Sequence, residues 1–290
     1  MTLKKQFPKK KKIRALIVEG GGMRGIFTAG VLDAFFKAGY DPFDLYMGVS
    51  AGACNLASHL AGQYQRNLRI YTNLMSKPEF ISFTRFLKGR HWMDLDWLWN
   101  MLAQKEPLNT WNISQNLKKN QKEFLIVSTS AYSGMPVYLS AEQHLLNDQL
   151  KASCAVPGLY RNFIEIDSEP LTDGGVSDPI PVAEAYRRGA RQITVLRSRP
   201  LNFVKKNGME SFIASLFVQS HRSLRTAITN HPETYMKAVK FINNPPDDVE
   251  IMQIAPPRPM ETKRLTRDLN ALFSDYQLGE SYGTAAIPRL

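Results

Sequence analysis

A glycine-rich turn between a short apolar run and a longer periodic one most constrains the fold of this chain. The turn reads EGGGMRG over Glu19–Gly25, and its glycines at positions 20, 22 and 25 spell G-x-G-x-x-G. The run RALIVE before it, Arg14–Glu19, predicts a buried strand, and the small and apolar positions of Arg24–Lys37 predict a helix. Glycines allow a helix to start this close to a strand. The sequence therefore predicts a strand, a glycine turn and a helix in one unit.

The alternation of strand and helix continues along the chain. Leu45–Val49 is a second apolar run, and Ala51–Tyr64 has the small and apolar composition of a packed helix. Further strands are expected over Glu123–Ser130, Pro136–Ser140 and Gln192–Arg199, and further helices near Glu142–Lys151 and Val182–Arg188. This order favours an α/β fold, with a mostly parallel central sheet and helices on both faces.

A dinucleotide-binding loop is the first interpretation of the glycine pattern. Such a loop needs an acidic residue at the C-terminal tip of the second strand, where it binds the ribose. Asp44 lies 19 residues beyond Gly25, but it precedes Leu45–Val49 instead of following it. The sequence therefore favours another use of the backbone N–H groups in this loop.

The C-terminal tip of the second strand reads GVSAG, Gly48–Gly52. G-x-S-x-G between a strand and a helix is the pattern of a nucleophile elbow, in which the glycines permit a strained turn that exposes the serine hydroxyl. The N-terminus of the following helix would direct free N–H groups towards an oxyanion. Ser50 is therefore the candidate nucleophile, and an ordinary glycine-flanked turn is the alternative.

A third glycine-framed loop reads TDGGVSDPIP, Thr172–Pro181. Asp173 stands before Gly174 and Gly175, whose lack of side chains would let this loop approach the serine closely. Asp-Gly-Gly alone is most often a turn. Because open α/β sheets place their sites at the carboxyl ends of parallel strands, we expect the three loops to meet in one crevice.

In this order the three loops resemble the motifs of the bacterial patatin-like phospholipases. GGGMRG resembles the oxyanion motif of that family, GVSAG its nucleophile motif and DGG its aspartate motif. KASCAVPGLY, Lys151–Tyr160, is similar to the Ala-Ser-x-Ala-x-Pro block that precedes the aspartate loop. The resemblance implies a three-layer α/β/α catalytic domain over 13–200. A basic tail over 1–12 would precede it, and a helical and strand extension over 201–290 would pack on the same domain.

The resemblance also implies a lipid acyl hydrolase, of the phospholipase A, lysophospholipase or esterase type, that uses a Ser–Asp dyad and neither a metal nor another cofactor. Ser50 would attack the ester carbonyl and Asp173 would take its proton. Partial burial would raise the Asp173 pKa above its ordinary value of about 3.9 and so make it a better base. The oxyanion loop would comprise Gly20, Gly21, Gly22, Met23, Arg24 and Gly25, with N–H donors around Gly21, Gly22 and Met23, and Gly48, Gly52, Gly174 and Gly175 are the other motif glycines. Arg24 would stabilise this loop or bind a lipid phosphate.

Two other functions stay open. A Ser–Asp–His triad would use His221 or His231, because both follow Asp173 in the order that α/β-hydrolases require. A triad elbow normally comes after several strands, however, whereas Ser50 follows the second, and His231 before Pro232 is expected to end a helix. The other alternative is a nucleotide- or lipid-binding module without catalysis, which the intact Ser50 and Asp173 disfavour.

The charge distribution bears on possible partners. The formal net charge is +11, but Lys4, Lys5, Lys9, Lys10, Lys11, Lys12 and Arg14 supply seven positive charges near the N-terminus. The rest of the chain therefore carries a net charge of only +4. This small excess disfavours a nucleic-acid partner, which would need a basic face on the folded domain. We expect the tail to contact anionic membranes instead. No signal peptide and no run of about 18 uncharged apolar residues is present, which predicts a cytoplasmic protein, in part at the membrane surface.

Two further groups of residues have a structural and a functional interpretation. Four tryptophans, Trp92, Trp97, Trp99 and Trp111, fall within twenty residues. We favour a packed subdomain there over an aromatic cap above an apolar substrate, because aromatic clusters more often form cores. Cys54 and Cys154 lack metal-ligand spacing and are expected to be small core residues.

Overall fold

The computed structural model describes residues 12–205 and 218–288, so the basic tail lies outside the described residues except for Lys12. Eight strands of the described residues form one sheet. They are β1 (Ile13–Val18), β2 (Leu45–Val49), β3 (Glu123–Ser130), β4 (Pro136–Ser140), β5 (Ile164–Ile166), β6 (Glu169–Asp173), β7 (Ala190–Leu196) and β8 (Glu250–Ile254).

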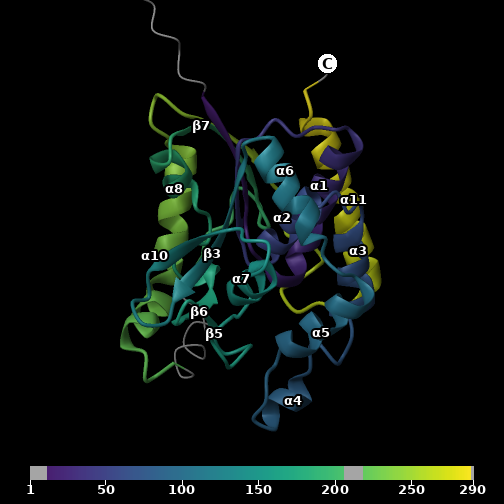
Figure 1. The fold of residues 1–290 in the computed structure, drawn as a ribbon, viewed down its shortest axis with the longest axis vertical. Helices are drawn as coiled ribbons and strands as arrows, with labels where there is room; N and C mark the ends of the chain where they lie inside the picture. Colours follow the sequence, from purple (N-terminus) through teal and green to yellow (C-terminus); the bar gives the residue numbers. More distant parts are fainter. Residues whose placement is uncertain (1–11, 206–217, 289–290) are drawn as a thin grey trace, which may run out of the picture.

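The sheet has the strand order β5-β6-β3-β2-β1-β7-β8, and β4 also pairs with β3. The five strands from β3 to β8 in this order are parallel, whereas β4 and β6 pair with β3, and β5 with β6, in antiparallel fashion. The expected mostly parallel sheet is confirmed. The carboxyl ends of β1, β2, β7 and β8 therefore lie at one edge, the lower end in Figure 1.

Helices cover both faces of the sheet. They are α1 (Gly25–Lys37), α2 (Ala51–Leu60), α3 (Arg66–Ile70), α4 (Phe83–Leu87), α5 (Leu95–Lys105), α6 (Thr110–Lys119), α7 (Leu146–Ser153), α8 (Val182–Arg187), α10 (Arg222–Asn243) and α11 (Leu269–Ala286). Figure 1 shows α8 and α10 on one side of the sheet and α1, α2 and α11 on the other. This arrangement confirms the three-layer architecture. Helix α2 is shorter than expected, because it ends at Leu60 before a turn in which Gly62 has a φ of 71°.

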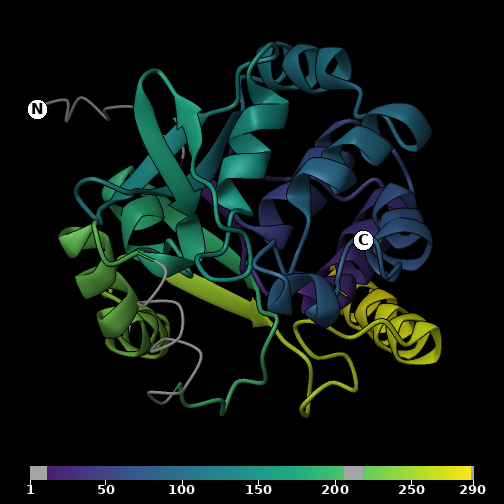
Figure 2. The same ribbon diagram turned by 90° about the horizontal axis from the view of Figure 1, so that it is seen from below.

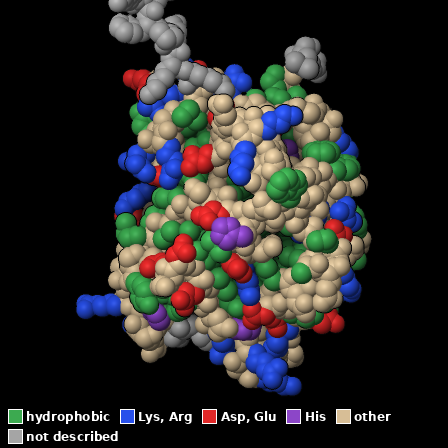
Figure 3. Space-filling model, in the orientation of Figure 1, with side chains coloured by type: hydrophobic (Ala, Val, Ile, Leu, Met, Phe, Trp, Pro, Cys, Tyr) green, Lys and Arg blue, Asp and Glu red, His purple; other side chains and the backbone are tan. Residues whose placement is uncertain are grey.

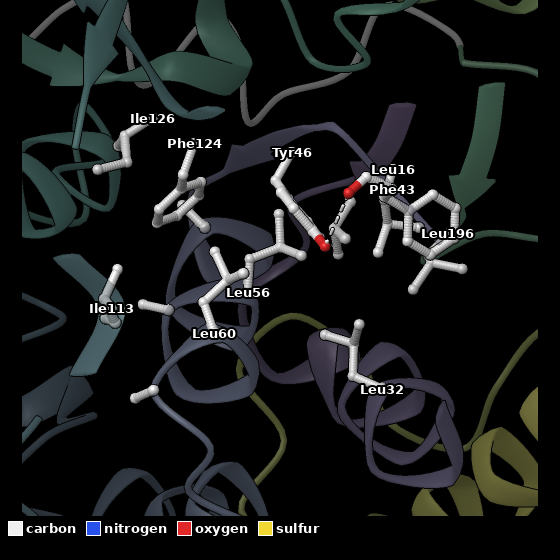
Figure 4. Packing of buried hydrophobic residues seen from close by; sticks show 14 of the residues in the cluster. Leu16, Leu32, Phe43, Tyr46, Leu56, Leu60, Ile113, Phe124, Ile126 and Leu196 are labelled. Atoms are coloured by element: carbon white, nitrogen blue, oxygen red, sulfur yellow. Dashed lines mark hydrogen bonds between the residues drawn. The ribbon is translucent and has the colours of Figure 1, made fainter. Parts of the chain in front are cut away.

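The core lies on both faces of the central strands. In β1, Leu16 and Val18 pack towards α1 and α2, whereas Ala15 and Ile17 pack towards α8 and α10. Figure 4 shows the first of these layers, with Leu16, Tyr46 and Leu196 of the sheet on one side and Leu32 of α1 and Leu60 of α2 on the other. Burial on both faces explains why this strand is a continuous apolar run.

The C-terminal helix α11 packs directly on α1. A Cβ atom on Gly279 would overlap the Phe27 carbonyl oxygen, and one on Gly30 would overlap the Tyr276 carbonyl oxygen. The Tyr276 hydroxyl also donates to the buried Asp33 carboxylate at 2.9 Å. The two backbones thus come together where side chains are absent.

None of the helices formed by residues 12–205 and 218–288 is both long and apolar enough to span a bilayer. On the face in Figure 3, Lys and Arg side chains are interspersed with Asp and Glu.

Candidate active site

Ser50 occupies a strained turn between β2 and α2. Its backbone angles, φ 54° and ψ −127°, lie in a region that residues other than glycine rarely adopt. The glycines on either side allow close packing, since a Cβ atom on Gly48 would overlap Ala53 and one on Gly52 would overlap the Val18 carbonyl group. The GVSAG sequence thus forms a tight turn between β2 and α2, with Ser50 only 7% exposed.

Ser153, at the end of α7, supports this elbow. The Ser50 N–H donates to Ser153 Oγ at 2.8 Å, and Ser153 Oγ donates to the Val127 carbonyl oxygen at 2.6 Å. Ser153 is fully buried. The sequence reasoning included Ser153 only as part of the KASCAVPGLY block and gave it no role. The feature that could have indicated this role is a small hydroxyl residue within the KASCAVPGLY block.

Asp173, the last residue of β6, supplies a buried carboxylate. Its Oδ1 accepts from the Gly175 N–H at 2.7 Å, whereas its Oδ2 is buried and has no hydrogen-bond partner among the described residues. Burial raises the pKa of Asp173 to about 6, and the neighbouring Ser50 hydroxyl, the Gly175 N–H and the Arg264 charge partly oppose this rise. A Cβ atom on Gly174 would overlap the Val127 carbonyl group, so glycine lets this loop pack on β3. The Ser50 hydroxyl is close enough to the Asp173 carboxyl to affect its pKa, and both residues line one cavity.

The glycine loop between β1 and α1 packs against the elbow. A Cβ atom on Gly20 would lie 3.0 Å from Ser50 Cβ and 2.9 Å from the Val49 carbonyl oxygen. Gly22 has a φ of 57° and begins a short 3₁₀ helix that leads into α1 at Gly25. The Gly21 and Gly22 N–H groups make no hydrogen bond to any residue within the described ranges.

Met23 and Arg24 complete this loop. The Met23 N–H donates to the Arg264 carbonyl oxygen at 3.1 Å, so it is not free to bind an oxyanion as we expected. The Arg24 side chain is 8% exposed and lines the same cavity as Ser50. Arg24 is therefore a buried residue of the site and not a surface arginine.

A buried ion pair anchors the start of the loop. The Glu19 carboxylate accepts from Arg197 Nε at 3.3 Å, from the Tyr235 hydroxyl at 2.9 Å and from the Ser198 N–H at 2.7 Å. The Ser198 hydroxyl donates to the Gly20 carbonyl oxygen at 2.7 Å. Sequence reasoning missed this network because Arg197 and Tyr235 lie outside the recognised motifs.

A cavity of about 780 Å³ joins these groups, and Ser50, Asp173 and Gly20–Gly22 all line it. The remainder of its lining is mainly apolar. Apolar side chains from the segment around α4 and α5 include Phe80, Phe86, Trp92, Leu98, Trp99 and Leu102. Trp92, Trp97 and Trp99 pack against a buried core cluster, in keeping with the packed subdomain that we favoured. Trp92 and Trp99 also line the cavity, while Trp111 is 59% exposed and lies outside the lining.

Both cysteines also line this cavity. Cys54 and Cys154 are half-buried, and their sulfur atoms lie 3.6 Å apart. Both pack against the hydrophobic core, as the sequence suggested, and also face the cavity. Within residues 12–205 and 218–288, no group of three or more His, Cys, Asp or Glu side chains is arranged to hold a metal ion.

The two histidines of the triad alternative differ in position. His221 caps the start of α10, and its ring contacts Ser220 and Phe163. His231 lies inside α10, because the helix continues through Pro232, so the expected helix end there is wrong. It lines the cavity, yet within the described part of the chain no hydrogen bond joins it to Ser50 or Asp173. Burial, together with the charges of Lys205 and Arg264, lowers its pKa to about 3.

Comparison with known proteins places these features in a family. Residues 16–186 match the family described as patatin-like phospholipase, and residues 221–290 match a domain of unknown function. The chain is 36% identical to the protein YjjU of Escherichia coli K12, over 93% of this chain and 75% of that relative. It is 27% identical to an NTE family protein of Mycobacterium bovis, over 58% of this chain and 44% of the relative.

A yeast enzyme is a more distant relative. Triacylglycerol lipase 4 of Saccharomyces cerevisiae is 24% identical over 58% of this chain, which covers 22% of the yeast enzyme. The chain therefore spans less than half the length of the mycobacterial and yeast relatives. The family match covers more than half of the chain and includes all three glycine-framed loops. This chain belongs to the patatin-like phospholipase family.

Proposed function

We propose that this protein hydrolyses acyl esters of lipids, with Ser50 as nucleophile and Asp173 as the base that acts directly on it. The observation that carries the proposal is the meeting of a strained serine elbow and a buried carboxylate at one largely apolar cavity. The family assignment supports lipid acyl hydrolysis in general.

The first step would form an acyl-enzyme. Asp173 Oδ2 takes the proton from Ser50 Oγ while Oγ attacks the ester carbonyl carbon. Because the Gly175 N–H holds Oδ1 at 2.7 Å, Oδ2 is the oxygen available for the proton. The Gly21 and Gly22 N–H groups then stabilise the negative oxygen of the tetrahedral intermediate, and one such donor typically contributes about 3 kcal/mol.

The second half of the reaction would restore the enzyme. Asp173 returns the proton to the departing alcohol oxygen as the intermediate collapses and the C–O bond of the ester breaks. A water molecule then attacks the acyl carbon and gives its proton to Asp173, which passes it to Ser50 Oγ as the fatty acid leaves. A carboxylate with a pKa of about 6 can serve as acid and base in turn near neutral pH.

The cavity lining supports a lipid substrate. Apolar side chains such as Phe80, Leu98 and Trp99 offer a surface to an acyl chain, and 780 Å³ lies in the range of pockets for small organic ligands. A triacylglycerol lipase among the relatives is in keeping with an ester of this kind.

A Ser–Asp–His triad is less well supported. A triad histidine must hydrogen-bond to both the serine and the aspartate, and His231 forms no hydrogen bond to either in the described part of the structure. A binding module without catalysis would not need the strained φ of Ser50, which costs stability.

Fluorophosphonate labelling tests the proposal. Incubation of the full chain with the probe, followed by peptide mapping, should place the label on Ser50, and Ser50→Ala should abolish it together with hydrolysis of a soluble ester. Ser281→Ala, at an exposed helix position, is the matched control and should keep both. Labelling elsewhere, or none in a folded protein that also lacks ester hydrolysis, would overturn the proposed function.

A further inference from the structure

Cys54 and Cys154 are brought together by the same turn that holds Ser50. Cys54 lies in the first turn of α2, where its N–H donates to the Ser50 carbonyl oxygen at 3.3 Å. Cys154 directly follows Ser153, whose hydroxyl accepts from the Ser50 N–H at 2.8 Å. Helices α2 and α7 pack against each other, and Figure 2 shows them side by side near the middle of the molecule. Two cysteines that lie 100 positions apart thus meet beside the candidate nucleophile.

The two sulfur atoms are already in contact. They lie 3.6 Å apart, at hydrogen-bonding distance for thiols, and a disulfide bond would bring them to about 2.05 Å. The sequence contains no other cysteine, so an intramolecular disulfide has only one possible pairing. It would form when the sulfur atoms move about 1.5 Å closer to each other.

Both thiols are open to small reagents. They are half-buried, and they line the cavity of about 780 Å³ that also holds Ser50 and Asp173. A peroxide molecule is smaller than any ester that this cavity would accept. The pair is therefore accessible to an oxidant without unfolding of the protein.

The two thiols differ in their electrostatic surroundings. Burial lowers the pKa of Arg66 to about 10, and a negative charge on Cys54 opposes this change, so the guanidinium lies near the Cys54 sulfur. A neighbouring cation favours attack by a thiolate. The hydrogen bond with Cys54 and burial raise the pKa of Cys154. The Asp173 charge raises it further, whereas donation from the Ser50 hydroxyl opposes the rise. Cys54 is therefore the thiol that reacts first.

We propose that Cys54 and Cys154 form an oxidation site, at which a peroxide converts the two thiols to a disulfide, and that this disulfide lowers the activity of Ser50. The effect on activity rests on the proposed function, whereas the formation of the disulfide does not.

The oxidation proceeds in two steps. The Cys54 thiolate attacks one peroxide oxygen, so that an S–O bond forms and the O–O bond breaks, and the departing oxygen leaves as water after it takes up a proton. The Cys154 sulfur then attacks the Cys54 sulfur. The S–S bond forms, the S–O bond breaks, and a second water leaves with the Cys154 proton. The dithiol loses two electrons and the peroxide gains them.

The disulfide disturbs the dyad because both cysteines are tied to it. Closing the gap moves α2, which begins at the elbow, or the residue after Ser153, which holds the Ser50 N–H. It also removes the Cys154 thiol that interacts with the Ser50 hydroxyl. Misplacement of a catalytic group by about 1 Å can cost about a hundredfold in rate. We therefore expect kcat to fall by at least about tenfold.

Oxidation of the full chain with hydrogen peroxide at pH 8 tests the site without an assay of activity. The remaining thiols are alkylated in denaturant, and the peptides are mapped by mass spectrometry. We expect a peptide pair joined through Cys54 and Cys154, in a protein that stays monomeric on a non-reducing gel. Thiols that are still alkylated, oxidation to sulfinic acid without a disulfide, or disulfide-linked dimers would overturn the site.

Turnover of a soluble ester tests the effect on Ser50. Each protein is compared with itself before and after oxidation, so that differences in basal activity between variants cancel. In the parent, kcat should fall by at least about tenfold and recover with dithiothreitol, and fluorophosphonate labelling of Ser50 should slow in parallel. Cys54→Ser and Cys54→Ala lack the thiol that reacts first and are the matched controls. Each should keep kcat within about twofold of its own value before oxidation.

Two results separate this inference from the proposed function. If the parent forms the disulfide but keeps its turnover, or if the Cys54 variants lose as much activity as the parent, the effect on Ser50 is refuted while the proposed function stands. If the reduced parent shows neither labelling nor turnover although the disulfide forms, the oxidation site stands and the proposed hydrolysis is refuted.

Discussion

Replacing Asp173 by asparagine tests the buried carboxylate through the stability of the fold. Burial raises its pKa from 3.8 to about 6, so the folded protein disfavours the ionised form relative to the unfolded chain. Each pKa unit corresponds to about 1.4 kcal/mol, so ionised Asp173 costs the fold about 3 kcal/mol at pH 8. This cost decreases as the pH falls through 6, because the carboxyl then binds a proton in the folded state. Asparagine keeps an oxygen for the Gly175 N–H and does not ionise.

We therefore expect Asp173→Asn to raise the free energy of unfolding by about 3 kcal/mol at pH 8 and by about 0.5 kcal/mol at pH 4. Urea unfolding followed by tryptophan fluorescence at both pH values measures this difference, provided that the free energy of unfolding of parent and variant has the same slope with urea concentration. Asp247→Asn, at an exposed position, should change stability by less than about 0.5 kcal/mol at both. A loss of stability at pH 8, or an equal change at both pH values, would refute the reasoning.

Three other perturbations probe single contacts. Ser153→Ala leaves the buried Ser50 N–H without its acceptor and should lower the free energy of unfolding by about 1–3 kcal/mol in urea titrations; an unchanged midpoint would contradict this role. Gly279→Ala places a Cβ atom on the Phe27 carbonyl oxygen and should cost about 1–3 kcal/mol, whereas an unchanged Tm would mean that α1 and α11 are not so closely packed. Deleting residues 1–12 should weaken binding to anionic vesicles at low salt, since each basic residue contributes about 1 kcal/mol near such a surface, with soluble-ester turnover unchanged; equal vesicle binding would refute the tail's role.

The sequence predicted the central strands and the three glycine-framed loops because these features depend on local pattern. GVSAG begins at Gly48, within Leu45–Val49, so the position of Ser50 directly after the strand could be predicted from adjacent residues. The glycines of the elbow were informative for the same reason, since a Cβ atom on Gly48 or Gly52 would collide with neighbouring backbone.

Features that depend on distant segments were not predictable from local pattern. The Met23 N–H binds the carbonyl oxygen of Arg264, which is far away in sequence and reaches the loop only because β8 lies beside β7. Pro232 suggested a helix end, but α10 continues through it because Tyr235 and Val239 pack in the core. Tertiary packing of this kind can offset the roughly 3 kcal/mol that an interior proline costs.

The pH dependence of kcat/KM on a soluble ester, for the parent, Asp173→Asn and His231→Gln, tests the direct Ser–Asp mechanism most closely. The base must be ionised, so the parent should lose activity about tenfold per pH unit below the Asp173 pKa of about 6. Asp173→Asn, although folded and more stable at pH 8, should lose nearly all activity. His231→Gln should keep the acidic limb at about 6 and stay within about tenfold of the parent. A folded His231→Gln protein as inactive as Ser50→Ala, or a profile without that limb, would contradict the Ser50–Asp173 dyad.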